Sequence, residues 1–159
     1  EVICKTAEVK VSKGAEVDVE INASSDLSFS SAGTSKTFIN VKANSLTLAS
    51  SGSSTVEAVV DVEDMKVDNS GMSNVTVVSG KTGSLQVDAS GSAKFNSGDV
   101  VIPTAYMIQS GSSKSLVNVS DTLKVNLVGN STLEFKDNPF IDLERIVSST
   151  LTRYSESSK

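Results

Sequence analysis

Two aspartates, Asp68 and Asp88, occupy equivalent places in the sequence, each three residues before a glycine (Gly71 and Gly91). If the two glycines mark the same turn in neighbouring backbone layers, the carboxylates lie one above the other, about 5 Å apart. Two carboxylates at that separation raise one pKa or bind a cation such as calcium. Alternatively, both side chains point into water at a corner and splay apart. We favour this second interpretation.

Other catalytic chemistry is limited by the composition. The chain contains no histidine, which excludes a Ser-His-Asp triad, a Cys-His pair and a zinc site with imidazole ligands. Cys4 is the only cysteine, so the chain has neither an intramolecular disulfide nor a cysteine metal cluster. We expect no cofactor, no catalytic residue and no enzymatic activity. A small carbohydrate-cleaving β-helix enzyme that uses paired carboxylates remains the alternative.

A second candidate site is a row of residues that each stand five places before a glycine: Ser28, Thr47, Lys66, Gln86, Tyr106 and Lys124. We call this row the front strip. Its candidate ligand-binding residues are Lys66, Gln86, Tyr106 and Lys124, with Tyr106 stacking on a sugar ring and Lys66 and Gln86 supplying hydrogen bonds. An ordinary exposed sheet face would show the same pattern.

The elements that position these side chains follow from a repeat. Seven of the ten glycines, at 14, 33, 52, 71, 91, 111 and 129, are separated by 19, 19, 19, 20, 20 and 18 residues. Apolar residues recur at fixed distances from the six glycines 33 to 129, four places before (Phe29, Leu48, Val67, Val87, Met107, Val125) and six places before (Leu27, Leu46, Met65, Leu85, Ala105, Leu123). A third row, six places after, has one polar member (Ile39, Ala58, Val77, Ser97, Val117, Phe135).

The spacing of two within each unit indicates strands with one buried side. Units of 19–20 residues with strands in the same register predict an all-β, right-handed parallel β-helix of six or seven coils. The glycines Gly33, Gly52, Gly71, Gly91, Gly111 and Gly129 are predicted to turn the chain with positive φ. The serines next to them, such as Ser51 and Ser53, are expected to stack as a polar ladder along this edge.

We predict one solenoid domain over residues 1–159. Residues 1–25 form an atypical first coil, because Val9 and Val11 are one place out of frame relative to Gly14. Residues 138–159 form a C-terminal capping segment, which lacks the glycine; within it, residues 138–151 fit either a last strand, which we favour, or a short helix.

The overall charge and hydropathy exclude two classes of partner. With 14 basic and 19 acidic residues the formal net charge is −5, so nucleic-acid binding is not expected. No run of residues approaches the 18 apolar positions of a transmembrane helix. A homo-oligomer that associates by sheet faces or by coil ends is left open.

The repeated phrases TLASSGSSTVEAVV, MKVDNSGMSNVTVV and SLQVDASGSAKF, and the stretch 121–147, resemble the family "putative auto-transporter adhesin, head GIN domain" of Bacteroidetes envelope proteins. The closing Lys136-Asp137-Asn138-Pro139 departs from the family pattern, because Asp137 stands where glycine is commoner. We therefore note the geometry of that turn as a point to check.

The resemblance implies a right-handed parallel β-helix that is exported to the bacterial periplasm, outer-membrane surface or extracellular space. It also implies an adhesin-like, non-catalytic role. Together with the outward row of side chains, this predicts a regular sheet face that meets a glycan or a surface protein. The family pattern carries no catalytic residues. A purely structural, oligomerising scaffold is a further alternative.

Overall fold

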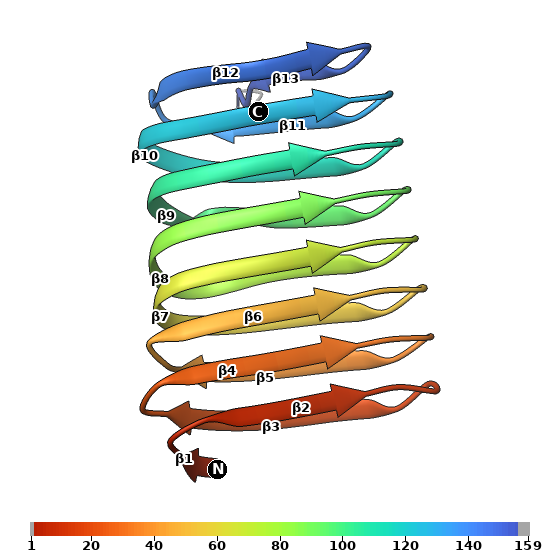
Figure 1. Cartoon of the computed structure of the whole chain (residues 1–159), viewed down its shortest axis with the longest axis vertical. Helices are drawn as coiled ribbons and strands as arrows, with labels where there is room; N and C mark the ends of the chain where they lie inside the picture. The colour runs from red at the N-terminus through yellow and green to blue at the C-terminus, as the bar shows by residue number, and fades with distance from the viewer. Residues whose placement is uncertain (1, 156–159) are drawn as a thin grey trace.

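Strands stacked in parallel make up the computed structural model, which describes residues 2–155 and contains no helix in that range (Figure 1). The strands are β1 (Val2–Cys4), β2 (Ala7–Val11), β3 (Glu16–Ala23), β4 (Asp26–Ser31), β5 (Lys36–Lys42), β6 (Ser45–Ser50), β7 (Thr55–Asn69), β8 (Asn74–Ala89), β9 (Lys94–Gln109), β10 (Lys114–Val128), β11 (Thr132–Lys136), β12 (Phe140–Val147) and β13 (Thr150–Arg153).

Every strand pairing is parallel and joins one coil to the coil above or below it. The chain climbs from the N-terminus at the bottom of Figure 1, and its winding is right-handed. The predicted right-handed parallel β-helix is therefore confirmed. It has about 8 turns rather than six or seven, because the two terminal coils also turn fully without a glycine in frame.

The solenoid is flattened into two faces. The front face, toward the viewer in Figure 1, holds β2, β4, β6, β12 and the C-terminal halves of β7 to β10. The rear face holds β3, β5, β11, β13 and the N-terminal halves of β7 to β10. The chain passes between the faces through a tight turn at one edge, the glycine edge, and through a wider bend at the other, the corner edge.

The core lies between the two faces and consists of the predicted rows. All residues four and six places before the glycines are at most 4% exposed, and the row six places after is at most 8% exposed. Ser97 is buried in that last row with the rest. Period-two burial on each strand thus gives two dry inner surfaces that pack against each other.

At the glycine edge, the six glycines from Gly33 to Gly129 have φ between 71° and 83°. Their backbones also stack closely. A Cβ added at Gly71 would lie 2.8 Å from the carbonyl oxygen of Gly52 in the coil below, and Gly52 shows the same distance to Gly33. Glycine is therefore required twice over, by the backbone conformation and by the contact between coils.

The polar ladder of this edge is buried one residue further from the glycine than expected. Ser51, Ser70, Ser90 and Ser110 are half-buried, and Ser53, Ser92 and Ser112 are exposed. In four of the six coils, those of Gly33, Gly52, Gly71 and Gly111, fully buried polar residues stand two places to either side of the glycine. Four coils close with a side-chain bond across the turn: Ser31 Oγ to Ser35 Oγ at 2.7 Å, Ser50 Oγ to Ser54 Oγ at 2.8 Å, Ser73 donating to Asn69 Oδ1, and Gln109 Nε2 donating to Ser115 Oγ. The coil of Gly91 has Ala89 and Ala93 instead.

In the first coil the glycine position belongs to Lys13. Glu16 pairs with Lys36, and Val11 pairs with Ser31, which places Lys13 opposite Gly33. Lys13 has φ 60°, and a Cβ on Gly33 would lie 3.3 Å from the Lys13 backbone nitrogen. The one-place frame shift of Val9 and Val11 is absorbed there, because Gly14 follows as a second left-handed residue (φ 74°).

The C-terminal segment is a last coil of two strands, β12 and β13, so the strand prediction is confirmed and the capping helix is wrong. Residues 1 and 156–159 lie outside the described residues. Asp137, which replaces the family's usual glycine, has φ 64° and keeps the left-handed turn. Ser148 has φ 55° in the last turn, where the Ser149 hydroxyl donates to Gly129 O at 3.0 Å.

All differences in length among the internal coils occur at the corner edge. Strand pairing keeps a constant register on both sides of the glycines. The corner residues between these constant stretches, some of which pair in a shifted register, number five in 59–63, six in 78–83 and 98–103, and four in 118–121. Register shifts lie at this edge in β8, β9 and β10. The corner therefore tolerates changes that the glycine edge does not show.

Candidate binding surface

The front strip is a continuous row on the front face. Strand register places Ser28 beside Thr47, Thr47 beside Lys66, Lys66 beside Gln86, Gln86 beside Tyr106 and Tyr106 beside Lys124. Ser28, Thr47, Lys66 and Gln86 are exposed, and Tyr106 and Lys124 are half-buried. The structure thus brings all the predicted residues together, at the inter-strand spacing of about 4.8 Å.

At the upper end of the front strip, Tyr106 and Lys124 contact Glu144 and each other. Tyr106 Oη donates to Glu144 Oε2 at 2.8 Å, and Lys124 Nζ lies 2.7 Å from Glu144 Oε1. Lys124 Nζ also sits 5.2 Å from the centroid of the Tyr106 ring. These three side chains form an exposed cluster that ties β12 to β9 and β10.

The same contacts set the pKa values of the cluster. The hydrogen bond from Lys124, and then that from Tyr106, lowers the pKa of Glu144. The hydrogen bond and charge of Glu144 raise the pKa of Lys124, and the hydrogen bond to Glu144 raises the pKa of Tyr106. Each shift favours the paired state at neutral pH, so the Tyr106 ring is less available to a ligand than an isolated tyrosine.

Asp68 and Asp88 are register partners on adjacent coils, as the repeat predicts. Asp68 is half-buried and Asp88 is exposed, and both lie on the outer side of the front face. The Lys66 ammonium lies 3.7 Å from Asp68 Oδ2. Within residues 2–155, no group of three or more histidine, cysteine, aspartate or glutamate side chains could hold a metal ion.

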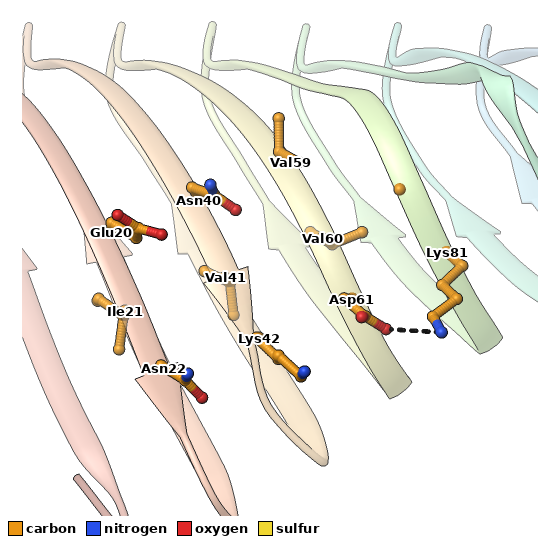
Figure 2. Close-up of a pocket in the computed structure, with 11 residues that line it drawn as sticks. Glu20, Ile21, Asn22, Asn40, Val41, Lys42, Val59, Val60, Asp61 and Lys81 are labelled. Atoms are coloured by element: carbon orange, nitrogen blue, oxygen red, sulfur yellow. Dashed lines mark ion pairs between the residues drawn. The ribbon is translucent and has the colours of Figure 1, made fainter. Parts of the chain in front are cut away.

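The largest hollow, of about 670 Å³, follows the corner edge and is lined by residues 22–24, 42–44, 61–63 and 81–83. Two smaller hollows lie on the rear face, where sequence reasoning placed no site. One hollow of about 430 Å³ is lined by β3, β5, β7 and β8 near the corner edge, with Glu20, Asn22, Asn40, Lys42, Val59, Asp61 and Lys81 around it (Figure 2). The buried Ile21, Val41 and Val60 lie between the two outer rows. These three side chains are at most 1% exposed and belong to the core, so the floor of the hollow is the strand backbone, and its walls are mostly polar side chains. We call it the corner hollow.

A bulge in β8 gives the corner hollow its far wall. The register between β7 and β8 shifts after Ala58, so that Val59 pairs with Ser79 and Val60 pairs with Gly80. A Cβ on Gly80 would lie 1.8 Å from Val60 O, which no side-chain-bearing residue could accept at this position. Gly80 (φ 115°) lets β8 return to β7, and Lys81 beyond it pairs with Asp61 at 3.3 Å.

A second hollow, of about 450 Å³, lies on the same strands toward the glycine edge. We call it the Phe38 hollow. Its centre is Phe38 on β5, which is 39% exposed and has Asp18 of β3 and Glu57 of β7 as its register partners. The neighbouring row is Glu16, Lys36 and Thr55, in which Lys36 Nζ lies 3.9 Å from Glu16 Oε1.

Sequence reasoning missed these hollows for two reasons. Outward residues of the rear face alternate with core residues and look like an ordinary wet sheet surface, so Phe38 gave the one available signal, an aromatic residue between Thr37 and Ile39 of the inward row. The corner hollow also depends on the irregular corner edge, which the glycine frame does not describe.

The fold and these surfaces define a β-solenoid with two broad, solvent-facing sheet faces. Comparison with protein families then identifies the chain: residues 2–139 match the family described as "Putative auto-transporter adhesin, head GIN domain", and the chain belongs to it. Comparisons with curated proteins and with solved structures give no match. The described residues contain no helix long and apolar enough to cross a membrane.

Proposed function

We propose that the chain is an exported, non-catalytic, adhesin-like surface domain that presents a sheet face to a glycan or protein partner. The observation that carries the proposal is the alignment of outward side chains into straight rows, coil over coil, such as the row from Ser28 to Lys124. A rigid face with side chains at regular spacing can contact a partner that has a repeating structure at many points at once. The family description, an auto-transporter adhesin, supports both export and binding.

The contacts of the acidic residues favour binding over catalysis. A glycosidase needs two carboxylates on opposite sides of a bound sugar, one of them held protonated. Here Asp61 is paired with Lys81, Glu144 with Lys124, and Asp68 with Lys66. The hydrogen bonds from Lys124 and then Tyr106 lower the pKa of Glu144, which is the wrong direction for a general acid.

A glycan array together with immobilised matrix proteins tests the proposal. We expect the purified chain to bind at least one class of either surface, and to release no reducing ends from the bound glycan over hours of incubation. Release of reducing ends would establish the enzyme alternative. Binding to neither surface would contradict the adhesin-like role.

Four single variants, Lys66→Ala, Gln86→Ala, Tyr106→Ala and Lys124→Ala, test whether the front strip is the contact face. All four side chains point outward, so the variants keep the core. If the front strip is the binding face, at least one of them weakens binding tenfold or more. If all four bind like the parent chain, the contact face lies elsewhere.

Export has its own test. We expect the protein to be degraded by protease added to intact cells of the bacterium that naturally makes it, as a surface location requires. Protection in intact cells with degradation after outer-membrane permeabilisation would place the protein in the periplasm instead. Protection in both would contradict export.

The open C-terminal end favours a scaffold as the second candidate function. In the last coil Leu143 continues the inner row of Val125 but is 55% exposed, and Phe140 and Val147 are 71% and 45% exposed. No coil covers these side chains in the described residues, and an exposed strand edge next to them is a site for association. Light scattering that shows a stable oligomer, lost on Leu143→Lys, would support the scaffold.

A further inference from the structure

Four aromatic side chains lie outside the core. Two of them have a lysine over the ring, and a third lies on the last coil, at the end of the solenoid. Lys124 covers the Tyr106 ring, and Lys136 Nζ lies 5.2 Å from the centroid of the Tyr154 ring. Phe140 sits on the last coil, at the open end. Phe38 alone lines a hollow on a sheet face and has no cation over its ring in the described residues.

Carboxylates flank the Phe38 ring on both sides. Asp18 and Glu57 are its register partners on β3 and β7, and each makes no ion pair within residues 2–155. Strand spacing places them about 4.8 Å from the Phe38 backbone on either side. An ionised carboxylate only accepts hydrogen bonds, so this pair is suited to a ligand rich in hydroxyl donors.

The Phe38 hollow continues into the corner hollow along one strand. Outward side chains of β5 run Lys36, Phe38, Asn40 and Lys42, about 6.6 Å apart and ~20 Å in total. Lys36 and Phe38 line the first hollow, and Asn40 and Lys42 line the second. Glu20 and Lys42 make no ion pair in the described part of the chain, so their charged groups remain available to a ligand.

We propose that the rear face between β3 and β7 binds a neutral oligosaccharide that runs along β5. One sugar ring packs its C–H face on Phe38 while its hydroxyls donate to Asp18 and Glu57. Further rings lie over the strand backbone that floors the corner hollow, within reach of the Asn40 amide and of Glu20 and Lys42. The inference rests on the proposed binding function and names its site and ligand class.

Charge and shape select a neutral glycan. The two hollows carry five carboxylates (Glu16, Asp18, Glu20, Glu57, Asp61) and three ammonium groups (Lys36, Lys42, Lys81), which disfavours an acidic polysaccharide. A protein partner normally meets a core of several aromatic and apolar anchors, whereas Phe38 is the one aromatic residue here. Two small polar-walled hollows in line suit an extended chain of small rings.

The experiment is a glycan array of neutral, amino and acidic oligosaccharides, followed by titration calorimetry with the neutral oligosaccharide that binds best. We expect the parent chain to bind neutral glycans, Phe38→Ala to bind at least tenfold more weakly, and Phe38→Trp to retain binding. Phe140→Ala is the matched control, because it removes an outer aromatic ring on the last coil, away from both hollows, and leaves affinity unchanged. Thermal unfolding of each variant verifies the fold, since Phe38 is outside the core.

The other outcomes distinguish failure of the rear-face site from failure of the proposed binding function. Binding that survives Phe38→Ala but is lost in Tyr106→Ala overturns the rear site and leaves the proposed function standing on the front strip. Preferential binding of acidic glycans overturns the ligand class. If the parent chain binds no glycan at all, the inference falls, and the adhesin-like role then depends on matrix-protein binding alone.

Discussion

At the glycine edge every internal coil turns with one backbone conformation, whereas at the corner edge the coils differ in length and in register. The glycines stack with backbone contacts that leave no room for a Cβ, and the pairing on both sides of them is constant. The corner edge holds between four and six residues per coil and carries the bulge that shapes the corner hollow. One edge therefore fixes the register of the solenoid, and the other is where its surface can vary.

The largest effect is expected from two one-residue insertions in the same coil, one at each edge, which compare how well the two edges tolerate a change in length. A serine inserted after Ser120 lengthens the shortest corner from four residues to five, a length found in 59–63, and we expect a cost below ~1 kcal/mol. A serine inserted after Ser110 lengthens the turn at Gly111 and reverses which side chains face the core on one flank. We expect a loss of more than ~3 kcal/mol, or failure to fold.

Urea unfolding followed by far-UV circular dichroism measures both insertions. Equal midpoints for the two variants would show that the edges do not differ in tolerance. A corner insertion that unfolds the chain while the turn insertion is tolerated would reverse the assignment of their roles.

The next effect in size is the substitution Gly71→Val. A valine there must hold φ near 75° and place its Cβ 2.8 Å from Gly52 O, so we expect a loss of about 2–4 kcal/mol in the free energy of unfolding. Thr76→Val, an outward position on the rear face, is the control. A loss for Gly71→Val no greater than for the control would remove the requirement for glycine.

The contrast between the edges also explains what the sequence predicts. Features that recur in every coil can be found from the sequence. The spacing of the glycines and the period-two rows identify the core residues and the parallel winding, and they place the polar Ser97 in the core. Ser31 and Ser51 have the same chemistry at neighbouring places around their turns, and only the register shows that Ser31 is buried while Ser51 is not fully covered.

Features that occur once escape this reasoning. The contact of Tyr106 with Glu144 joins residues 38 apart through a register shift in β12, and Gly80 follows a bulge whose register shift differs from those of β9 and β10. The front strip was predictable as a row because it repeats, whereas the Phe38 hollow was not, because a single aromatic side chain has no period.

Inside the glycine edge, Ser73→Ala removes the hydroxyl that donates to the Asn69 side-chain oxygen. The oxygen is then buried without that donor, and we expect a loss of about 1–2 kcal/mol. The double variant Asn69→Ala/Ser73→Ala reproduces the alanine pair that the next coil has at 89 and 93. We expect it to lose less than the sum of the two single variants, as a coupled pair should. Additive losses would show that the two side chains do not stabilise each other.

A smaller effect, of opposite sign, is expected at the corner edge. Asp137 is exposed and holds φ 64° without the conformational freedom of glycine. Asp137→Gly relieves that strain and should raise the free energy of unfolding by about 0.5 kcal/mol, whereas Asp137→Ala, which tolerates positive φ less well, should lower it. Denaturant midpoints of the three proteins measured side by side test the order. Destabilisation by glycine would show that the aspartate side chain itself stabilises the turn.

The smallest expected effect on stability concerns Glu144. This residue lies at the register shift in β12, on the front face and away from the corner edge. Its pKa is lowered from 4.5 by hydrogen bonds from Lys124 and then Tyr106, so its contribution to stability is present above pH 4.5 and is lost as the pH falls through the folded-state value. The raised pKa of Lys124 gives the matching loss only at strongly alkaline pH. Glu144→Gln should therefore lower Tm slightly at pH 7, and less at pH 3 or in 1 M salt, because the pair is exposed and screened. An equal decrease at pH 3 and pH 7 would mean that packing of the side chain, and not its charge, holds the last coil to the solenoid.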